Sequence, residues 1–212
     1  MKNTLWRFGD SWSTTQDTDY FKIELNHSKY VADYFNLDYK NLGIGGYSNL
    51  QIFNDLIKNQ NNFKENDIIL INFASVSRVA VVENGIVSCV SNGDAYNTHK
   101  LMDDVIIHDM GKPISDILFY LVCSFIQSLV DRNIKTYFFF LDQRVELGLP
   151  NELVFKSNLG SGFIHWCIEN DYQDLSPKGN VHYKLGSQKD IANKIIQLIG
   201  ENDNQEKRMG NQ

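Results

Sequence analysis

The amino-acid sequence predicts an α/β protein, built as a three-layer α/β/α sandwich around a mainly parallel, doubly wound sheet of the flavodoxin-like type. Two observations lead to this prediction. Strand-like and helix-like segments alternate along the chain, which is the order of a doubly wound fold. In addition, "DIILINFAS" (67–75) and "KTYFFFLD" (135–142) are continuous apolar runs of strand length, as expected of parallel strands that are buried on both faces.

The N-terminal part of the chain predicts two strand–helix pairs. A short strand is expected over Thr4 to Phe8, and a helix over Ser28 to Phe35, whose apolar and aromatic residues recur on one helical face. The segment "LDYKNLGIGG" (37–46) predicts a second strand that runs into a glycine-rich turn. Ser48 or Asn49 can then cap the helix that contains "NLQIFNDLIKN".

The middle of the chain predicts a hairpin and the longest helix. "RVAVVENGIVSCV" (78–90) has apolar runs on both sides of Glu83-Asn84-Gly85, which is typical of a β-hairpin. The segment 114–132 has the strongest helical pattern, and Pro113 lies next to its first turn.

The C-terminal part predicts two more helices. A short one is expected around 163–170, and "GSQKDIANKIIQLIG" (186–200) carries isoleucines on one stripe. The chain of 212 residues is long enough for one large domain. We expect that domain over residues 1–200, with 78–110 as an insertion that contains the hairpin, and a polar, disordered tail over 201–212.

Composition and charge exclude several classes of function. The net charge is −6 and no dense cluster of Lys and Arg is present, so no nucleic-acid partner is expected. The longest apolar block, 117–130, is too short and too polar to span a bilayer. The start of the chain lacks the hydrophobic region of a secretory signal, which predicts a cytoplasmic protein without membrane contact. The three cysteines have unrelated spacings, so neither a disulfide framework nor a zinc site is expected. No metal and no cofactor are expected for the protein.

Three polar or glycine-rich segments fall at the ends of expected parallel strands. They are Gly9-Asp10-Ser11, Gly45-Gly46 and Ala74-Ser75. Ligand sites of doubly wound sheets gather beyond the carboxyl ends of the strands. We therefore expect these three segments to lie on one edge of the sheet.

Ser11 is the candidate nucleophile, and it needs a base to remove its proton. His182 is the best candidate base, because "KGNVHYKLGSQKDIA" places it in a loop directly before the last helix. Gly46 is the candidate oxyanion donor, since no Cβ hinders the approach of a substrate to a glycine N–H. Each motif alone is also typical of an ordinary turn. The other histidines have no evident partner: His27, His99, His108 and His165.

Taken together, these segments resemble the SGNH (GDSL-type) hydrolase family. "FGDSWS" (8–13) is similar to the block that contains the nucleophile, and "NLGIGGYSN" (41–49) is similar to the block whose last glycine, here Gly46, donates to the oxyanion. "NVHYKLGSQKDIA" (180–192) resembles the final block with the catalytic histidine. The resemblance covers roughly residues 4 to 200 and implies a serine hydrolase of this fold.

One departure concerns the oxyanion hole. The family's third block has an asparagine after a buried strand, whereas this chain has "NFASVSR" (72–78). Ser75 is the nearest substitute by position, because Asn72 comes too early and is expected within the strand. Some virus-encoded members have a comparable replacement with an arginine shortly after it, and Arg78 matches that pattern.

A second departure concerns the triad acid. In the family it usually lies two or three residues before the histidine, where this chain has Gly179 and Asn180. The acid fixes the imidazole tautomer and stabilises the imidazolium, and Asn180, Asp174 or a backbone carbonyl could orient His182 instead. We therefore expect an atypical Ser-His dyad.

The resemblance implies hydrolysis of a small acyl or carbohydrate O-acyl ester. Asp10, Trp12, Tyr47 and Arg78 are the candidate substrate-binding residues, and the two aromatic ones neighbour the catalytic blocks. Two alternatives stay open. One is a weak or inactive SGNH-fold protein that binds glycans or acts as a structural subunit, in a homo-oligomer or a virion. The other is a flavodoxin-like nucleotide binder with a phosphate on a helix N-terminus near Gly9 to Ser13, which would leave His182 unexplained.

Overall fold

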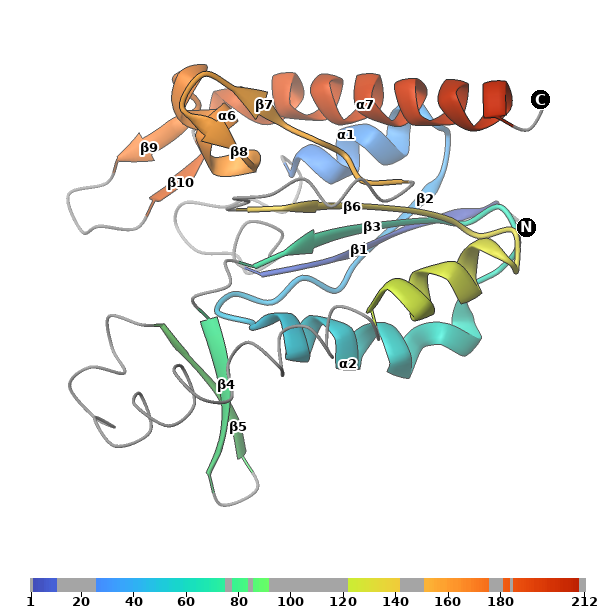
Figure 1. The fold of residues 1–212 in the computed structure, drawn as a ribbon, viewed down its shortest axis with the longest axis horizontal. Helices are drawn as coiled ribbons and strands as arrows, with labels where there is room; N and C mark the ends of the chain where they lie inside the picture. The colour runs from blue at the N-terminus through green and yellow to red at the C-terminus, as the bar shows by residue number, and fades with distance from the viewer. Residues whose placement is uncertain are drawn as a thin grey trace.

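Four parallel strands form the central sheet of the protein. The computed structural model describes residues 2–10, 26–74, 78–83, 86–91, 122–141, 151–175, 181–183 and 185–209. In spatial order the strands are β2 (Asp38–Asn41), β1 (Thr4–Phe8), β3 (Ile68–Phe73) and β6 (Lys135–Phe140) (Figure 1). All three neighbouring pairs run parallel, which confirms the predicted doubly wound sheet.

Helices cover both faces of this sheet (Figure 1). On one face lie α1 (His27–Tyr34), α6 (Phe163–Glu169) and α7 (Gln188–Met209). On the other face lie α2 (Asn49–Asn59) and the helical residues 122–130. The predicted three-layer α/β/α arrangement is therefore confirmed.

Alternation along the strands divides the core between these two layers. Leu5 packs in the layer of α1 and α7, whereas Trp6 packs in the layer of α2, because successive side chains of a strand project to opposite faces. All six residues of β3 are buried, which confirms the prediction from its continuous apolar run.

The start of α2 is fixed by a capping box. The Ser48 side chain accepts a hydrogen bond from Gln51 N–H, and the Gln51 side chain accepts one from Ser48 N–H at 2.9 Å, so two otherwise unpaired helix donors are satisfied. Ser48 is thus the cap, and Asn49 has another role. Its Nδ2 donates to the carbonyl oxygen of Ala74 at 3.1 Å, which ties α2 to the end of β3.

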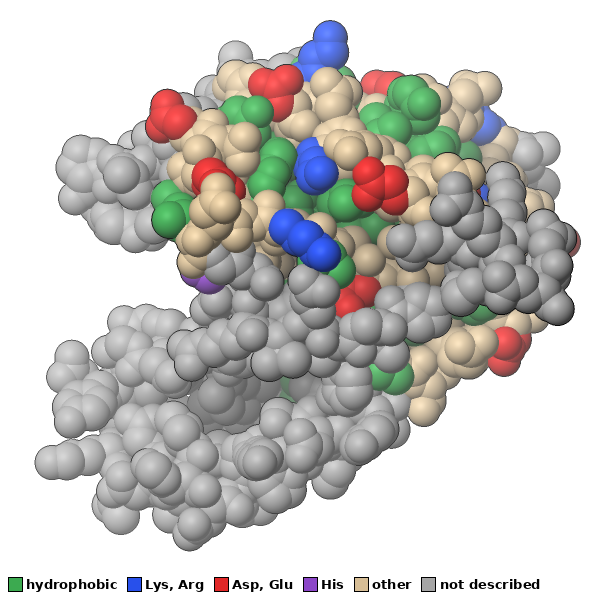
Figure 2. All heavy atoms as spheres, turned by 45° about the horizontal axis from the view of Figure 1, so that its top comes forward, with side chains coloured by type: hydrophobic (Ala, Val, Ile, Leu, Met, Phe, Trp, Pro, Cys, Tyr) green, Lys and Arg blue, Asp and Glu red, His purple; other side chains and the backbone are tan. Residues whose placement is uncertain are grey.

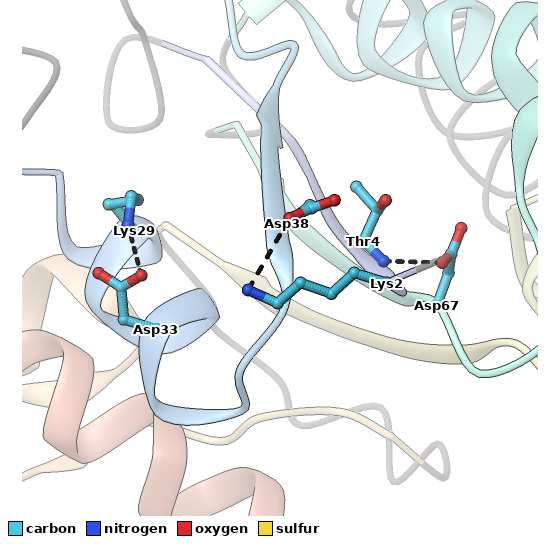
Figure 3. Close-up of polar contacts among 6 residues, drawn as sticks. All are labelled: Lys2, Thr4, Lys29, Asp33, Asp38 and Asp67. Carbon is cyan, nitrogen blue, oxygen red and sulfur yellow. Dashed lines mark hydrogen bonds and ion pairs between the residues drawn. The ribbon is translucent and has the colours of Figure 1, made fainter.

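A buried carboxylate holds the opposite edge of the sheet together. Asp67, directly before β3, is 1% exposed and accepts hydrogen bonds from Thr4 N–H (2.8 Å), Trp6 Nε1–H (2.9 Å) and Lys64 N–H (3.0 Å). Figure 3 shows the bond to Thr4 together with two exposed ion pairs, Lys2–Asp38 and Lys29–Asp33. Asp67 therefore joins β1 to the turn before β3.

The last helix extends past the point where a disordered tail was expected. Residue 201 lies within α7, which continues to Met209. The reason is a set of polar contacts that tie this end of the helix to the sheet. Asp203 accepts hydrogen bonds from Lys135 Nζ, at 2.6 Å, and from the Tyr137 hydroxyl, and Asn202 Nδ2 donates to the carbonyl oxygen of Glu152 at 3.1 Å.

Residues 151–155 run beside β6. The N–H of Phe138 donates to Asn151 O (3.2 Å) and the N–H of Leu153 donates to Phe138 O (2.8 Å).

Short elements complete the described chain. Two are 3₁₀ turns, η2 (Gln60–Asn62) and η4 (Leu185–Ser187). The others are antiparallel hairpins: β4–β5 (Arg78–Glu83, Ile86–Ser91), β7–β8 (Lys156–Ser157, Gly160–Ser161) and β9–β10 (Gln173–Leu175, Val181–Tyr183). The β4–β5 hairpin lies where the sequence predicts one.

Acidic and basic side chains are interspersed on the face of the molecule formed by α1 and α7 (Figure 2). Within the described ranges, no helix combines the length and the apolar character needed to cross a membrane.

Candidate active site

The glycine-rich loop after β2 lies directly beside the end of β1. Leu42 N–H donates to the carbonyl oxygen of Arg7 at 2.8 Å, and Ile44 N–H donates to that of Gly9 at 3.1 Å. The loop that holds Gly46 therefore runs alongside residues 7–9, which precede Ser11 in the chain.

Gly46 occupies a position that favours glycine. Its φ is +84°, in the left-handed region that residues with a Cβ rarely adopt. No heavy atom of the described residues outside its chain neighbours lies within 4 Å of the place where a Cβ would stand. Tyr47 N–H donates to Ile44 O at 3.3 Å and closes this turn. The geometry leaves open space on one side of Gly46.

A buried amide–carboxylate bond joins the ends of β1 and β3. Asn72 Nδ2 donates to Asp10 Oδ1 at 2.9 Å, and both residues are 0% exposed. The Asp10 side chain thus lies in the interior, and its contact with substrate stays a prediction. Asn72 lies within β3, as expected, but its bond to Asp10 was missed. A strand pattern contains no signal for a partner on another strand.

Three segments were expected at one edge of the sheet, and their described residues lie there: Gly9-Asp10, Gly45-Gly46 and Ala74. Gly9 contacts the loop that holds Gly46, and Ala74 is bonded to Asn49 at the start of α2. Arg78 opens β4, which packs beside α2 (Figure 1). Four candidate residues fall outside the described ranges: Ser11, Trp12, Ser75 and Asn180.

His182 lies in a strand and not in the loop that the sequence predicts. It is the central residue of β10, and the register places it opposite Asp174 of β9. The difference arises because 173–175 and 181–183 pair with each other, an antiparallel contact that was not anticipated. Figure 1 shows this hairpin at the end of the molecule toward which the strands of the central sheet run.

The start of the last helix is fixed to the start of α1. Gln188 Oε1 accepts a hydrogen bond from His27 N–H at 2.8 Å and lies 3.3 Å from His27 Nδ1. Since an amide oxygen only accepts, the contact favours the tautomer with the proton on Nδ1. The contact anchors the first residue of α7, six positions after His182.

Arg7 is a fully buried cation close to this contact. Its guanidinium carbon lies 5.1 Å from the centroid of the Phe139 ring, and its Nη1 donates to Leu70 O at 3.3 Å. Burial, and secondly the charge of Arg7, hold the pKa of His27 well below its ordinary value. Burial likewise raises the pKa of Tyr39. His27 is thus a neutral, structural histidine.

We expect the buried His27 to make stability depend on pH. Its folded pKa is depressed, so below the unfolded value of about 6.5 the unfolded chain binds a proton that the folded protein does not. The free energy of unfolding then falls as pH falls, by up to about 1.4 kcal/mol per pH unit for this one group. Urea unfolding at several pH values between 7.5 and 5 measures the slope.

His27→Gln should flatten that slope, and His165→Gln is the matched control in α6. A slope that is unchanged in His27→Gln would show that other groups cause the acid sensitivity.

Tyr47 and its neighbours form the outer part of the glycine-rich loop. Burial and the nearby Asp55 carboxylate, to which the hydroxyl is hydrogen-bonded, raise the pKa of Tyr47. Ile44 and Leu50 are 36% and 48% exposed. The surface around Gly46 is therefore partly apolar.

The fold and this edge define a doubly wound α/β domain with its candidate site at the carboxyl ends of the strands. Among the described residues, no group of three or more His, Cys, Asp or Glu side chains could hold a metal ion. No known family model matches the chain. No curated protein matches it either.

Solved structures that match the chain include two esterases. The psychrotrophic esterase EstA from Pseudoalteromonas sp., in a form inhibited by monoethylphosphonate, aligns with a TM-score of 0.48 and 12% identity over 94% of this chain and 97% of that chain. The acetyl xylan esterase AlAXEase aligns with a TM-score of 0.37 and 13% identity over 94% and 74%. The strand order and the parallel register of the central sheet show the doubly wound α/β fold.

Proposed function

We propose that the protein is a serine esterase of the SGNH type, which hydrolyses a small acyl or carbohydrate O-acyl ester through an acyl-Ser11 intermediate. The observation that carries the proposal is the shared edge of the sheet. Gly9, which precedes the candidate nucleophile by two residues, lies 3.1 Å from the loop that holds Gly46, measured between its carbonyl oxygen and Ile44 N.

In the proposed reaction, Ser11 Oγ attacks the ester carbonyl carbon while His182 takes the hydroxyl proton. The carbonyl π electrons move to the oxygen, and Gly46 N–H donates to this oxyanion. Collapse of the intermediate breaks the ester C–O bond, and His182 returns the proton to the departing alcohol. Water then attacks the acyl-Ser11 ester in the same way and releases the carboxylic acid.

Other residues support these steps in the proposal. Ser75 completes the oxyanion hole from the segment after β3, in the place of the family's asparagine. Asp10 is proposed as a positioning residue, since its bond to Asn72 ties the residue before Ser11 to β3.

The substrate is proposed to be an ester with a short acyl group. Trp12, Tyr47 and Arg78 are the proposed contacts to the alcohol or sugar part. The exposed Ile44 and Leu50 flank Gly46 in the sequence and support an apolar contact to the acyl part.

Hydrolysis of p-nitrophenyl acetate, butyrate and octanoate, and of acetylated sugars, tests the proposal. We expect turnover of the short acyl esters by the folded protein. If none of these substrates is cleaved, the alternative of a glycan-binding or structural subunit, in a homo-oligomer or a virion, would replace the esterase.

Gly46→Ala tests the oxyanion donor. A Cβ at φ +84° costs about 1–2 kcal/mol in backbone strain, and relief of that strain reorients the N–H. We expect kcat/KM to fall by about 10²-fold to 10³-fold, the range known for loss of an oxyanion donor. Gly200→Ala, which also has open space at its Cβ position but no positive φ, is the control and should keep full activity. Equal activity of both variants would show that turnover does not depend on the left-handed conformation of Gly46.

A further inference from the structure

The strand β2 stands first in the central sheet, and among the residues that the structure describes it pairs with β1 alone. Asp38 N–H donates to Asn3 O at 2.9 Å, and Leu42 N–H donates to Arg7 O at 2.8 Å. Successive residues of a strand direct their backbone N–H and C=O groups to opposite sides. Tyr39 therefore directs its N–H and C=O away from β1, to the outer side of β2.

Two side chains of opposite charge flank Tyr39 on one face of the sheet. Asp38 and Lys40 are both exposed, and they share a face because side chains alternate along a strand. Lys40 Nζ lies 4.4 Å from the centroid of the Trp6 ring, and Asp38 Oδ1 lies 3.8 Å from Lys2 Nζ (Figure 3). The outer strand thus presents one negative and one positive group, one on each side of Tyr39.

We propose that β2 pairs antiparallel with β2 of a second copy of this chain, about a twofold axis between the two Tyr39 residues. Each Tyr39 N–H then donates to the Tyr39 C=O of the other copy, which makes them a hydrogen-bonded pair of an antiparallel ladder. Asp38 of each copy lies directly opposite Lys40 of the other, and opposite charges at such positions stabilise the pairing. The same patch serves on both copies, as a twofold dimer requires.

The charges select this register from its neighbours. An axis at Asp38 would place two carboxylates opposite each other, and an axis at Lys40 would place two ammonium groups opposite each other, which is unfavourable. Charged residues on an outer strand disfavour indiscriminate pairing, whereas an axis at Tyr39 makes them complementary. The ladder is short, because Leu37 N–H already donates to Ala32 O at 2.9 Å. Since small interfaces go with weak association, we expect a dimer that dissociates on dilution.

Sedimentation velocity at micromolar to millimolar concentrations tests this pairing with two charge-reversal variants. Asp38→Lys leaves two positive charges beside Tyr39, and Lys40→Asp leaves two negative ones. Each variant should repel its own copies and associate at least about tenfold more weakly than wild type. An equimolar mixture of the two variants again places opposite charges at both positions. We expect the mixture to form a heterodimer about as tightly as wild type forms its dimer, which also shows that both variants are folded.

Lys58→Asp is the matched control, because Lys58 is 65% exposed and lies on α2. It should associate as wild type does. A wild type that stays monomeric at the highest concentration overturns the inference. Single variants that associate as tightly as wild type, or a mixture that associates no better than the single variants, overturn it too. The readout involves no ester hydrolysis, so failure of the proposed function would leave this result unchanged.

Discussion

We expect Ser11→Ala to lower kcat/KM for a short acyl ester by about 10⁴-fold or more, because Ser11 Oγ forms the acyl intermediate in the proposed mechanism. The loss falls on kcat, while KM changes little, since the hydroxyl acts in the chemical step and not in binding. Steady-state kinetics with p-nitrophenyl butyrate measure both constants. Ser13→Ala, two residues further along the same segment, is the control and should keep its activity.

His182→Ala should cause a loss of similar size, with His165→Ala as its control. Groups that act as one unit are not additive, so the Ser11→Ala/His182→Ala double variant should be no slower than either single variant. Additive losses would show that the two residues do not act in one step.

Asp67→Ala lowers the free energy of unfolding by about 3–5 kcal/mol. The substitution leaves three donors without their acceptor, and hydrogen bonds to charged groups are worth about 1.5–3 kcal/mol each, though not additively. Two of the donors are buried or part-buried groups of β1, the Thr4 N–H and the Trp6 indole N–H. Urea unfolding followed by Trp fluorescence measures the change, and we expect the unfolding midpoint to move to a much lower urea concentration.

Asp38→Ala serves as the control for that variant. Asp38 is 64% exposed and its ion pair with Lys2 spans 3.8 Å, so its loss should change stability by less than about 1 kcal/mol. An Asp67→Ala midpoint close to that of Asp38→Ala would show that the three bonds at Asp67 do not hold this edge of the sheet.

Most of the regular elements could be predicted from local pattern. The first strand has the predicted bounds, Thr4 to Phe8, because Gly9 ends an apolar run. The first residue of α2 follows from Ser48 and Gln51, whose side chains form a capping box within four residues of sequence. Such signals lie inside a few consecutive residues, so a single sequence contains them.

The features that could not be predicted depend on contacts between segments far apart in the chain. The sequence from residue 201 onward is polar, and its helix depends on Asp203 meeting Lys135 and Tyr137. Arg7 is a charged residue in a strand, yet it is fully buried against Phe139 of β6. Neither partner can be inferred from a local pattern.

The candidate site was predicted in part for the same reason. The rule that ligand sites lie at the carboxyl ends of parallel strands places Gly9, Gly46 and Ala74 on one edge, and the structure confirms this for all three. The burial of Asp10 and the pairing of His182 with Asp174 depend on which strands meet. Those pairings required the three-dimensional structure.

Covalent labelling with a fluorophosphonate probe, followed by peptide mass spectrometry, tests the central claim most directly. The account predicts a phosphonyl adduct on Ser11 of the folded wild-type protein, and its loss in both Ser11→Ala and His182→Ala. A folded wild-type protein that stays unlabelled over long exposure and several pH values, or an adduct on a different residue, would contradict the claim that Ser11 is an activated nucleophile.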